Sequence, residues 1–243
     1  MSGVPLIEMK PLALVFFALS TAAALAAEYP PASAVLQSIR HAQATQKMDL
    51  KGSLETQPAD ASKRPTEASF RLIADGTNLR YVFSDPEPVT LHLKIGENDS
   101  ELMQTGGTDA GKFTPANFSK KILGTDLSYE DLALKFIYWS RGAVEGEDHM
   151  KTMDVWKIRL QAPPGGRSAY REVVLWVGKR TGALVRAEGF DANGKLIKRF
   201  EVISAQVVNG LWVLQRLRIE AFDPATGKLV SRTSMTIDAP STS

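Results

Sequence analysis

Apolar and polar residues alternate along most of this chain, the pattern of a β-strand with one face buried and one face in water. Four runs between residues 48 and 95 carry this alternation, and residues 74–78 (Ala-Asp-Gly-Thr-Asn) predict a turn between the second and third. The apolar positions of the four runs are Met48, Leu50 and Leu54; Phe70 and Leu72; Leu79, Tyr81 and Phe83; and Val89, Leu91, Leu93 and Ile95.

The second half of the chain repeats this pattern. Trp156, Ile158 and Leu160 alternate with basic residues, whereas residues 173–177 are apolar at every position, which predicts a strand covered on both faces. Asn-Gly within residues 190–196 indicates a tight hairpin, and residues 222–229 repeat that hairpin motif. We count about eleven strands joined mainly by short turns. They predict one curved antiparallel sheet, a sandwich or a barrel.

Two segments have helical rather than strand periodicity. Val35, Leu36 and Ile39 predict a short amphipathic helix from Ala32 to about Ala44. Ser128 stands three residues before Asp131, which is the spacing of a capping box, so a second helix is expected from Tyr129 to about Ser140. Glu130 and Asp131 lie in its first turn, where the helix dipole favours negative charge.

Leu132, Phe136 and Trp139 would share one face of the second helix. This face either plugs the core of the sheet or belongs to a movable lid. The glycines at 106, 107 and 111 before the helix and the polar stretch 142–148 after it would supply flexible joints for a lid.

The N-terminus has a basic flank, a short apolar core and small residues before Glu28, which is typical of a secretory signal peptide over residues 1–27. A transmembrane anchor is the alternative, but about 16 apolar or small residues are few for a span of roughly 20. Residues 28–243 are then expected to form a single exported domain. The chain has no cysteine, and its net charge of +2 is spread without a basic stripe, which argues against nucleic-acid binding.

The sequence offers little catalytic chemistry. His41, His92 and His149 have no metal-ligand spacing, and no nucleophile or metalloprotease motif occurs. Helix-start geometry accounts for the paired carboxylates Glu130 and Asp131. We therefore expect no enzyme activity, no metal and no cofactor.

Four phrases of the sequence together resemble the LolA-like superfamily of outer-membrane lipoprotein-sorting proteins, in particular its uncharacterised exported branch. They are ILGTDLSYEDL (122–132), WKIRLQAP (156–163), YREVVLWV (170–177) and FDANGKLIK (190–198), and the resemblance spans roughly residues 33–238. It implies an α+β, mainly β fold, an unclosed antiparallel β-barrel with a short N-terminal helix and a helical lid or plug. It also implies a periplasmic carrier or receptor that binds lipid or lipoprotein acyl chains, with a membrane transporter or receptor as a further partner.

One position departs from that family. Strict lipoprotein carriers have an arginine–proline pair after the second strand, where this chain has Ala74-Asp75-Gly76. The resemblance therefore implies lipid binding in the broad sense.

The lipid site predicted from alternation has a sheet side and a lid side. A one-residue error in register would exchange the two faces of the sheet. The alternative function is an envelope interaction or sensor module with a packed core and a protein partner. The predicted sheet side is Phe70, Leu72, Tyr81, Phe83, Leu91, Leu93, Trp156, Ile158 and Leu160, and the lid side is Leu132, Phe136 and Trp139.

Overall fold

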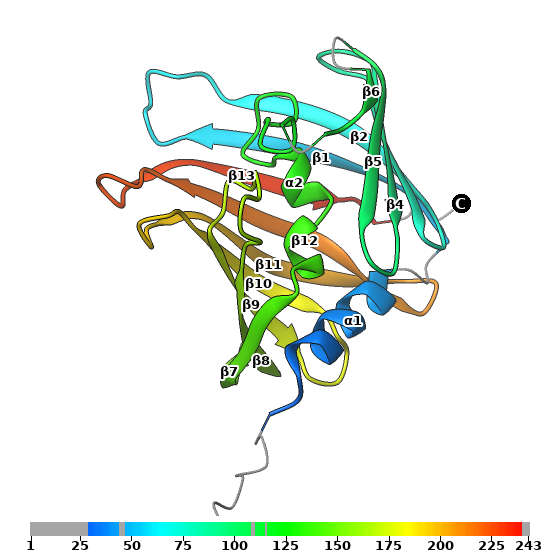
Figure 1. Ribbon diagram of the computed structural model, residues 1–243. Coiled ribbons are helices and arrows are strands. Elements are labelled where there is room, and N and C mark those ends of the chain that lie inside the picture. Colours follow the sequence, from blue (N-terminus) through cyan, green and yellow to red (C-terminus); the bar gives the residue numbers. More distant parts are fainter. Residues whose placement is uncertain (1–28, 44–46, 108–109, 115, 240–243) are drawn as a thin grey trace, which may run out of the picture.

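The computed structural model describes residues 29–43, 47–107, 110–114 and 116–239, so the predicted signal peptide lies outside the described residues. Thirteen strands form one antiparallel sheet in the order β6-β5-β4-β3-β2-β1-β13-β12-β11-β10-β9-β8-β7. The fold is mainly β, and the sheet is unclosed because β6 and β7 form its two edges (Figure 1). The strands are β1 (Met48–Pro58), β2 (Thr66–Asp75), β3 (Asn78–Phe83), β4 (Val89–Ile95), β5 (Ser100–Gly106), β6 (Gly111–Lys112), β7 (Arg141–Met150), β8 (Met153–Gln161), β9 (Glu172–Gly178), β10 (Leu184–Phe190), β11 (Leu196–Val208), β12 (Leu211–Phe222) and β13 (Leu229–Ile237).

Two meanders make up the sheet. Strands β1–β6 and β7–β13 each run as neighbours in sequence order, and the pairing of β1 with β13 joins them. In that pairing Gly52 lies opposite Ile237, and a Cβ at Gly52 would stand 2.5 Å from the carbonyl oxygen of Thr236. Glycine at residue 52 therefore permits close backbone approach where the two meanders meet.

The prediction of about eleven strands was too low. Arg141–Met150, of which residues 142–148 were predicted as a polar loop, forms the edge strand β7, and Gly111–Lys112 forms the short strand β6. Most positions of β7 are exposed, so it lacks the apolar alternation that marks a half-buried strand. The prediction that residues 173–177 are covered on both faces is confirmed, since all five side chains in β9 are buried.

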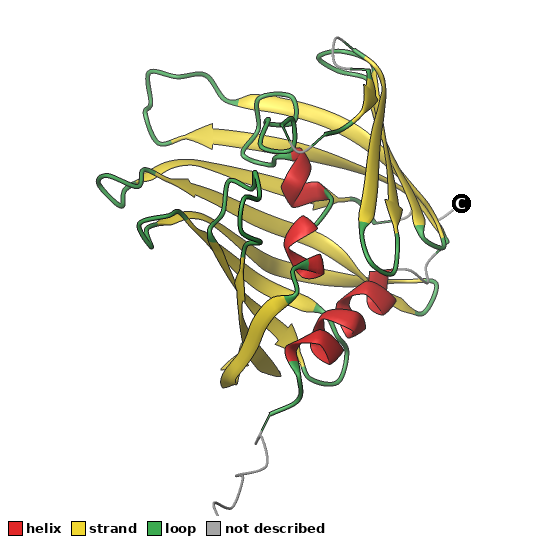
Figure 2. Cartoon of the chain, viewed as in Figure 1, coloured by secondary structure: helices red, strands yellow, loops and turns green. Residues whose placement is uncertain are grey.

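Three helical segments cross one side of the curved sheet (Figure 2). They are α1 (Ala32–Gln43), α2 (Tyr129–Leu132) and the 3-10 helix η1 (Lys135–Tyr138), and α1 agrees with its prediction. In the described ranges none of them has the length and apolar character needed to cross a membrane.

The single helix predicted from Tyr129 to about Ser140 was wrong. It starts as predicted, but α2 lasts one turn, and Leu134 takes a left-handed conformation with φ of 45° before η1 begins. Aromatic and β-branched residues dominate positions 136–139, and these are weak helix formers. Apolar groups pack on several sides of this stretch, so tertiary contacts override helical continuity. We call residues 129–139 the plug.

Candidate functional site

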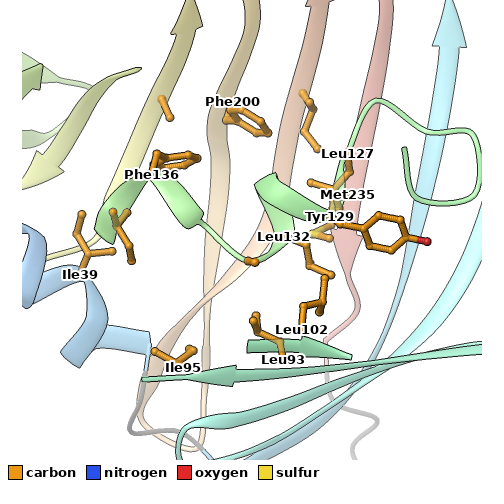
Figure 3. Close-up of a cluster of buried hydrophobic side chains, with 14 of the residues drawn as sticks. Ile39, Leu93, Ile95, Leu102, Leu127, Tyr129, Leu132, Phe136, Phe200 and Met235 are labelled. Atoms are coloured by element: carbon orange, nitrogen blue, oxygen red, sulfur yellow. The ribbon is translucent and has the colours of Figure 1, made fainter. Parts of the chain in front are cut away.

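An apolar cavity of about 360 Å³ lies between the plug, helix α1 and the facing side of the sheet. Side chains from both meanders reach it, so the fold brings together residues far apart in sequence. Figure 3 shows part of the surrounding cluster, including Ile39 of α1, Leu132 and Phe136 of the plug, and Phe200 and Met235 of the sheet. The lining is Ile39, Ala42, Met48, Leu72, Ala74, Leu79, Tyr81, Leu93, Ile95, Leu127, Asp131, Leu132, Leu134, Phe136, Gly182, Ala183, Leu184, Val185, Arg186, Ala187, Phe200, Val202, Trp212, Val213, Leu214, Leu217, Met235 and Ile237.

Some of the residues predicted for the sheet side line this cavity, and others do not. Leu72, Tyr81 and Leu93 line it. The ring of Tyr81 borders the hollow, and burial raises its pKa to about 12, so its hydroxyl stays neutral. The remaining six pack beside the cavity in the same hydrophobic core: Phe70, Phe83, Leu91, Ile158 and Leu160 are buried, and Trp156 is partly buried.

The plug residues divide between two hollows. Leu132 and Phe136 line the apolar cavity, but Trp139 lines a separate groove. The break at Leu134 explains this, because it ends the helical register that would have kept all three on one face. Leu132 and Phe136 therefore line one hollow together, and Trp139 lines the other.

The capping box at the start of the plug is confirmed. The Asp131 amide donates to Ser128 Oγ at 3.3 Å, and the Ser128 amide donates to Asp131 Oδ2 at 2.8 Å. Asp131 also accepts hydrogen bonds from Tyr170 Oη at 2.5 Å and from Lys198 Nζ at 2.7 Å. Capping alone therefore does not account for this carboxylate. It ties the plug to β11 and to the loop before β9.

Two further acidic side chains hold the segment in place. Glu130 is buried, and its Oε2 accepts from the Ala169 amide at 3.1 Å. Burial raises the pKa of Glu130. Just before the plug, Asp126 is fully buried and accepts from Ser231 Oγ at 2.7 Å and Thr233 Oγ1 at 3.0 Å, both in β13. Buried, satisfied carboxylates of this kind fix a conformation, so the plug is fastened at several points.

Helix α1 holds the other end of the plug through an arginine. Arg40 Nη1 donates to the carbonyl oxygen of Ile137 at 3.0 Å, and its guanidinium lies 5.5 Å from the centre of the Tyr138 ring. Arg40 therefore supplies a cation against the plug.

The separate groove is larger and more polar than the cavity. Its volume is about 1050 Å³, and it lies between α1, the β4–β5 turn, the end of the plug and edge strand β7. Its lining includes Arg40, Glu97, Asn98 and Ser140 beside Trp139 and Val144.

Sequence reasoning missed most of the cavity wall, since five of the 28 lining residues were among those predicted. Residues from α1 and from β10–β13, such as Ile39, Phe200 and Met235, line it. Helical periodicity did mark Ile39 as apolar, but nothing in the sequence placed α1 over this part of the sheet.

The described residues contain no group of three or more histidine, cysteine, aspartate or glutamate side chains arranged to hold a metal ion. His149 lies in β7, where its Nδ1 is 2.9 Å from Asp154 Oδ1. The cavity wall offers mainly apolar contact, and its charged members are Asp131, which pairs with Lys198, and Arg186.

Comparison with solved structures establishes the class of fold. A DUF1329 family protein from Desulfovibrio piger aligns with a TM-score of 0.65 and 19% identity over 86% of this chain and 92% of that one. A LolA superfamily protein from Nitrosomonas europaea gives 0.62 and 14% over 87% and 93%. A domain proposed as an outer membrane lipoprotein-sorting protein, from Vibrio parahaemolyticus, gives 0.63 and 19% over 85% and 90%. The chain therefore has the LolA-like fold.

A family model described as "Uncharacterized protein" matches residues 110–241, more than half of the chain. The chain belongs to that family. No curated protein matches its sequence significantly.

Proposed function

We propose that this protein binds a lipid acyl chain in the apolar cavity and acts as a carrier or receptor in the bacterial periplasm. The cavity itself carries the proposal. Its volume of about 360 Å³ is at the lower end of the range for ligand sites, and its lining is apolar apart from a few positions. An acyl chain matches this lining, since each buried methylene contributes about 0.8 kcal/mol.

The size of the cavity favours a single acyl tail, with the lipid headgroup outside. The plug covers the tail, and the bonds from Lys198, Tyr170 and Arg40 hold the plug closed. A lipid, or the acyl group of a lipoprotein, is the ligand class. The likeness to LolA-like folds and the predicted signal peptide agree with a role between the two membranes, where a transporter or receptor would exchange the ligand.

A fluorescent fatty acid tests this proposal together with two tryptophan variants. Leu184 lines the cavity and Val144 lines the groove, and both are partly buried strand residues. Leu184→Trp fills the cavity and should weaken fatty-acid binding about tenfold or more, whereas Val144→Trp should leave it unchanged. Native mass spectrometry of gently purified protein should show bound lipid in the wild type and less of it in Leu184→Trp.

Two results would count against the proposal. The proposal would be wrong if the wild-type protein carried no lipid and bound no fatty acid. Recovery of the protein with a protein partner instead would support the alternative of an interaction module. Loss of fatty-acid binding in Val144→Trp alone would indicate that the ligand binds in the groove.

A further inference from the structure

Large apolar side chains are exposed at the turn between β11 and β12. Trp212 is 71% exposed, Val207 55% and Leu211 43%, and only two other large hydrophobic residues in the described ranges are comparably exposed. We call residues 207–212 the hairpin tip. Clusters of exposed apolar residues are costly in water and mark interaction surfaces.

The hairpin tip is apolar on both of its faces. Val207 pairs with Trp212 and Val208 pairs with Leu211, so each cross-strand pair points to one face of the hairpin. A hairpin that only covered a core would carry polar residues on its outer face. Val208 is buried in the core, so the face that carries Val207 and Trp212 is the exposed one, and its apolar side chains suit insertion into an apolar medium.

The hairpin tip lies at the mouth of the apolar cavity. Trp212 and the two residues after it line the cavity, together with Ala42 near the C-terminal end of α1. The pairing of β11 with β12 shifts register around Ser204, and such a bulge bends the hairpin just before its tip. The apolar surface is thus continuous from the exposed tip into the cavity.

Charge on the hairpin itself favours an anionic surface, although exposed Asp238, just after β13, lies beside Gln206, whose Nε2 donates to the Asp238 carbonyl oxygen at 3.3 Å. No acidic residue occurs between Glu201 and Glu220, whereas Arg216 is exposed within this stretch. Exposed Lys151 also reaches β11, where its Nζ donates to the carbonyl oxygens of Val202 and Ile203 at 2.6 and 3.0 Å. An exposed arginine on the same strand as an exposed tryptophan matches a bilayer surface, where indole rings lie at headgroup level and cations attract anionic lipid.

We propose that the hairpin tip docks this protein on a phospholipid bilayer containing anionic lipid, with the mouth of the cavity facing the membrane. This inference goes beyond the proposed function because it assigns a surface outside the cavity. It holds whichever ligand the cavity accepts.

Vesicle cosedimentation tests the inference. The protein is expressed from the full sequence and is purified in whatever processed form the cells produce. Every variant shares the same N-terminus, so any contribution of that segment cancels. The wild type should bind phosphatidylcholine vesicles that contain phosphatidylglycerol, and more weakly vesicles without it. Val207→Ser/Leu211→Ser should reduce partitioning about tenfold. Neither residue lines the cavity, so fatty-acid binding should be retained.

Val230→Ser is the matched control. Val230 is 45% exposed, but it lies in β13 next to Leu229, which pairs with Phe222 at the far end of β12 from the tip. This variant should bind vesicles like the wild type. Trp212 should also shift its fluorescence to shorter wavelength on vesicles, and Trp212→Phe should bind without most of that shift.

Three results would overturn the inference: no vesicle binding by the wild type, equal losses in the tip variant and in Val230→Ser, or a dimer that depends on the tip and ignores vesicles. Vesicle binding without fatty-acid binding would instead contradict the proposed function and leave the docking surface standing.

Discussion

The plug separates two hollows that differ in size and chemistry. The groove beside β7 is about 1050 Å³ and has charged and polar residues in its wall, whereas the cavity above the sheet is about 360 Å³ and is almost wholly apolar. Neighbouring plug residues serve both, because Phe136 lines the cavity while Tyr138 and Trp139 line the groove. Helix α1 is shared in the same way, with Ile39 on one side and Arg40 on the other.

This comparison shows that the chemistry of the wall, rather than volume, selects the candidate lipid site. A groove whose wall mixes charged and polar groups with apolar ones can stay filled with water at lower cost, but an apolar cavity gains free energy when an apolar ligand replaces water or empty space. The smaller hollow is therefore the better acyl site. Each prediction below concerns a substitution at the cavity or the plug, and compares it with a control substitution at the groove or on the protein surface.

The largest expected effect comes from truncating Phe136. Its side chain is 1% exposed, so Phe136→Ala should lower the free energy of unfolding by about 3–5 kcal/mol. Tyr138→Ala on the groove side should cost roughly 1–2 kcal/mol, because Tyr138 is only partly buried and loses one hydrogen bond to Gly96. Urea denaturation of both variants measures the difference. Equal losses would mean that the two hollows are packed alike.

The next effect concerns the bond that closes the plug over the cavity. Lys198→Ala would leave the buried carboxylate of Asp131 without its cation, which should cost about 3 kcal/mol and open the plug. Exposed Lys47 pairs with Asp75 at 3.5 Å, so Lys47→Ala should change stability little. Hydrogen exchange should rise in residues 129–139 of the first variant only. Unchanged exchange there would show that Asp126 and Glu130 hold the plug without Lys198.

Much of this fold could be predicted because the spacing of apolar residues within one segment shows which face of that segment is buried. Alternation identified the inner residues of β2, β3, β4 and β8, and the Ser128–Asp131 spacing identified the start of α2. Leu72, Tyr81 and Leu93 followed from that alternation as cavity residues.

The remaining features depend on contacts between distant segments. Edge strand β7 has no buried face to reveal it, and the break at Leu134 arises where packing overrides helix periodicity. Asp131 reads as a capping residue in sequence, and its pairing with Lys198, 67 residues away, exists only in the folded chain. The cavity wall from β10–β13 was missed for the same reason, since the sequence does not show how the two meanders join.

The smallest expected effect is a pH-dependent change in thermal stability at two glutamates, one in the plug and one on the exposed edge strand. Burial raises the pKa of Glu130, Asp131 adds repulsion, and the contacts with Ser168, Ala169 and Lys198 oppose both. The folded state then holds this proton more tightly than the unfolded state, so the stability contributed at acidic pH is lost as pH rises through the folded pKa. Glu130→Gln cannot ionise and keeps an acceptor for the Ala169 amide, so its Tm should exceed that of the wild type at neutral pH.

That advantage of Glu130→Gln should shrink at mildly acidic pH, and Glu145 in β7 supplies the control of opposite sign. Its hydrogen bond from Arg159 lowers its pKa, so it contributes stability above its unfolded pKa and loses it as pH falls through the folded pKa. Glu145→Gln should therefore lower Tm at neutral pH, and the deficit should fade on acidification. Thermal melts of both variants across this pH range test the pair. The same sign in both would mean that Glu130 is not buried by the plug, and the contrast between the plug and the exposed edge strand would fail.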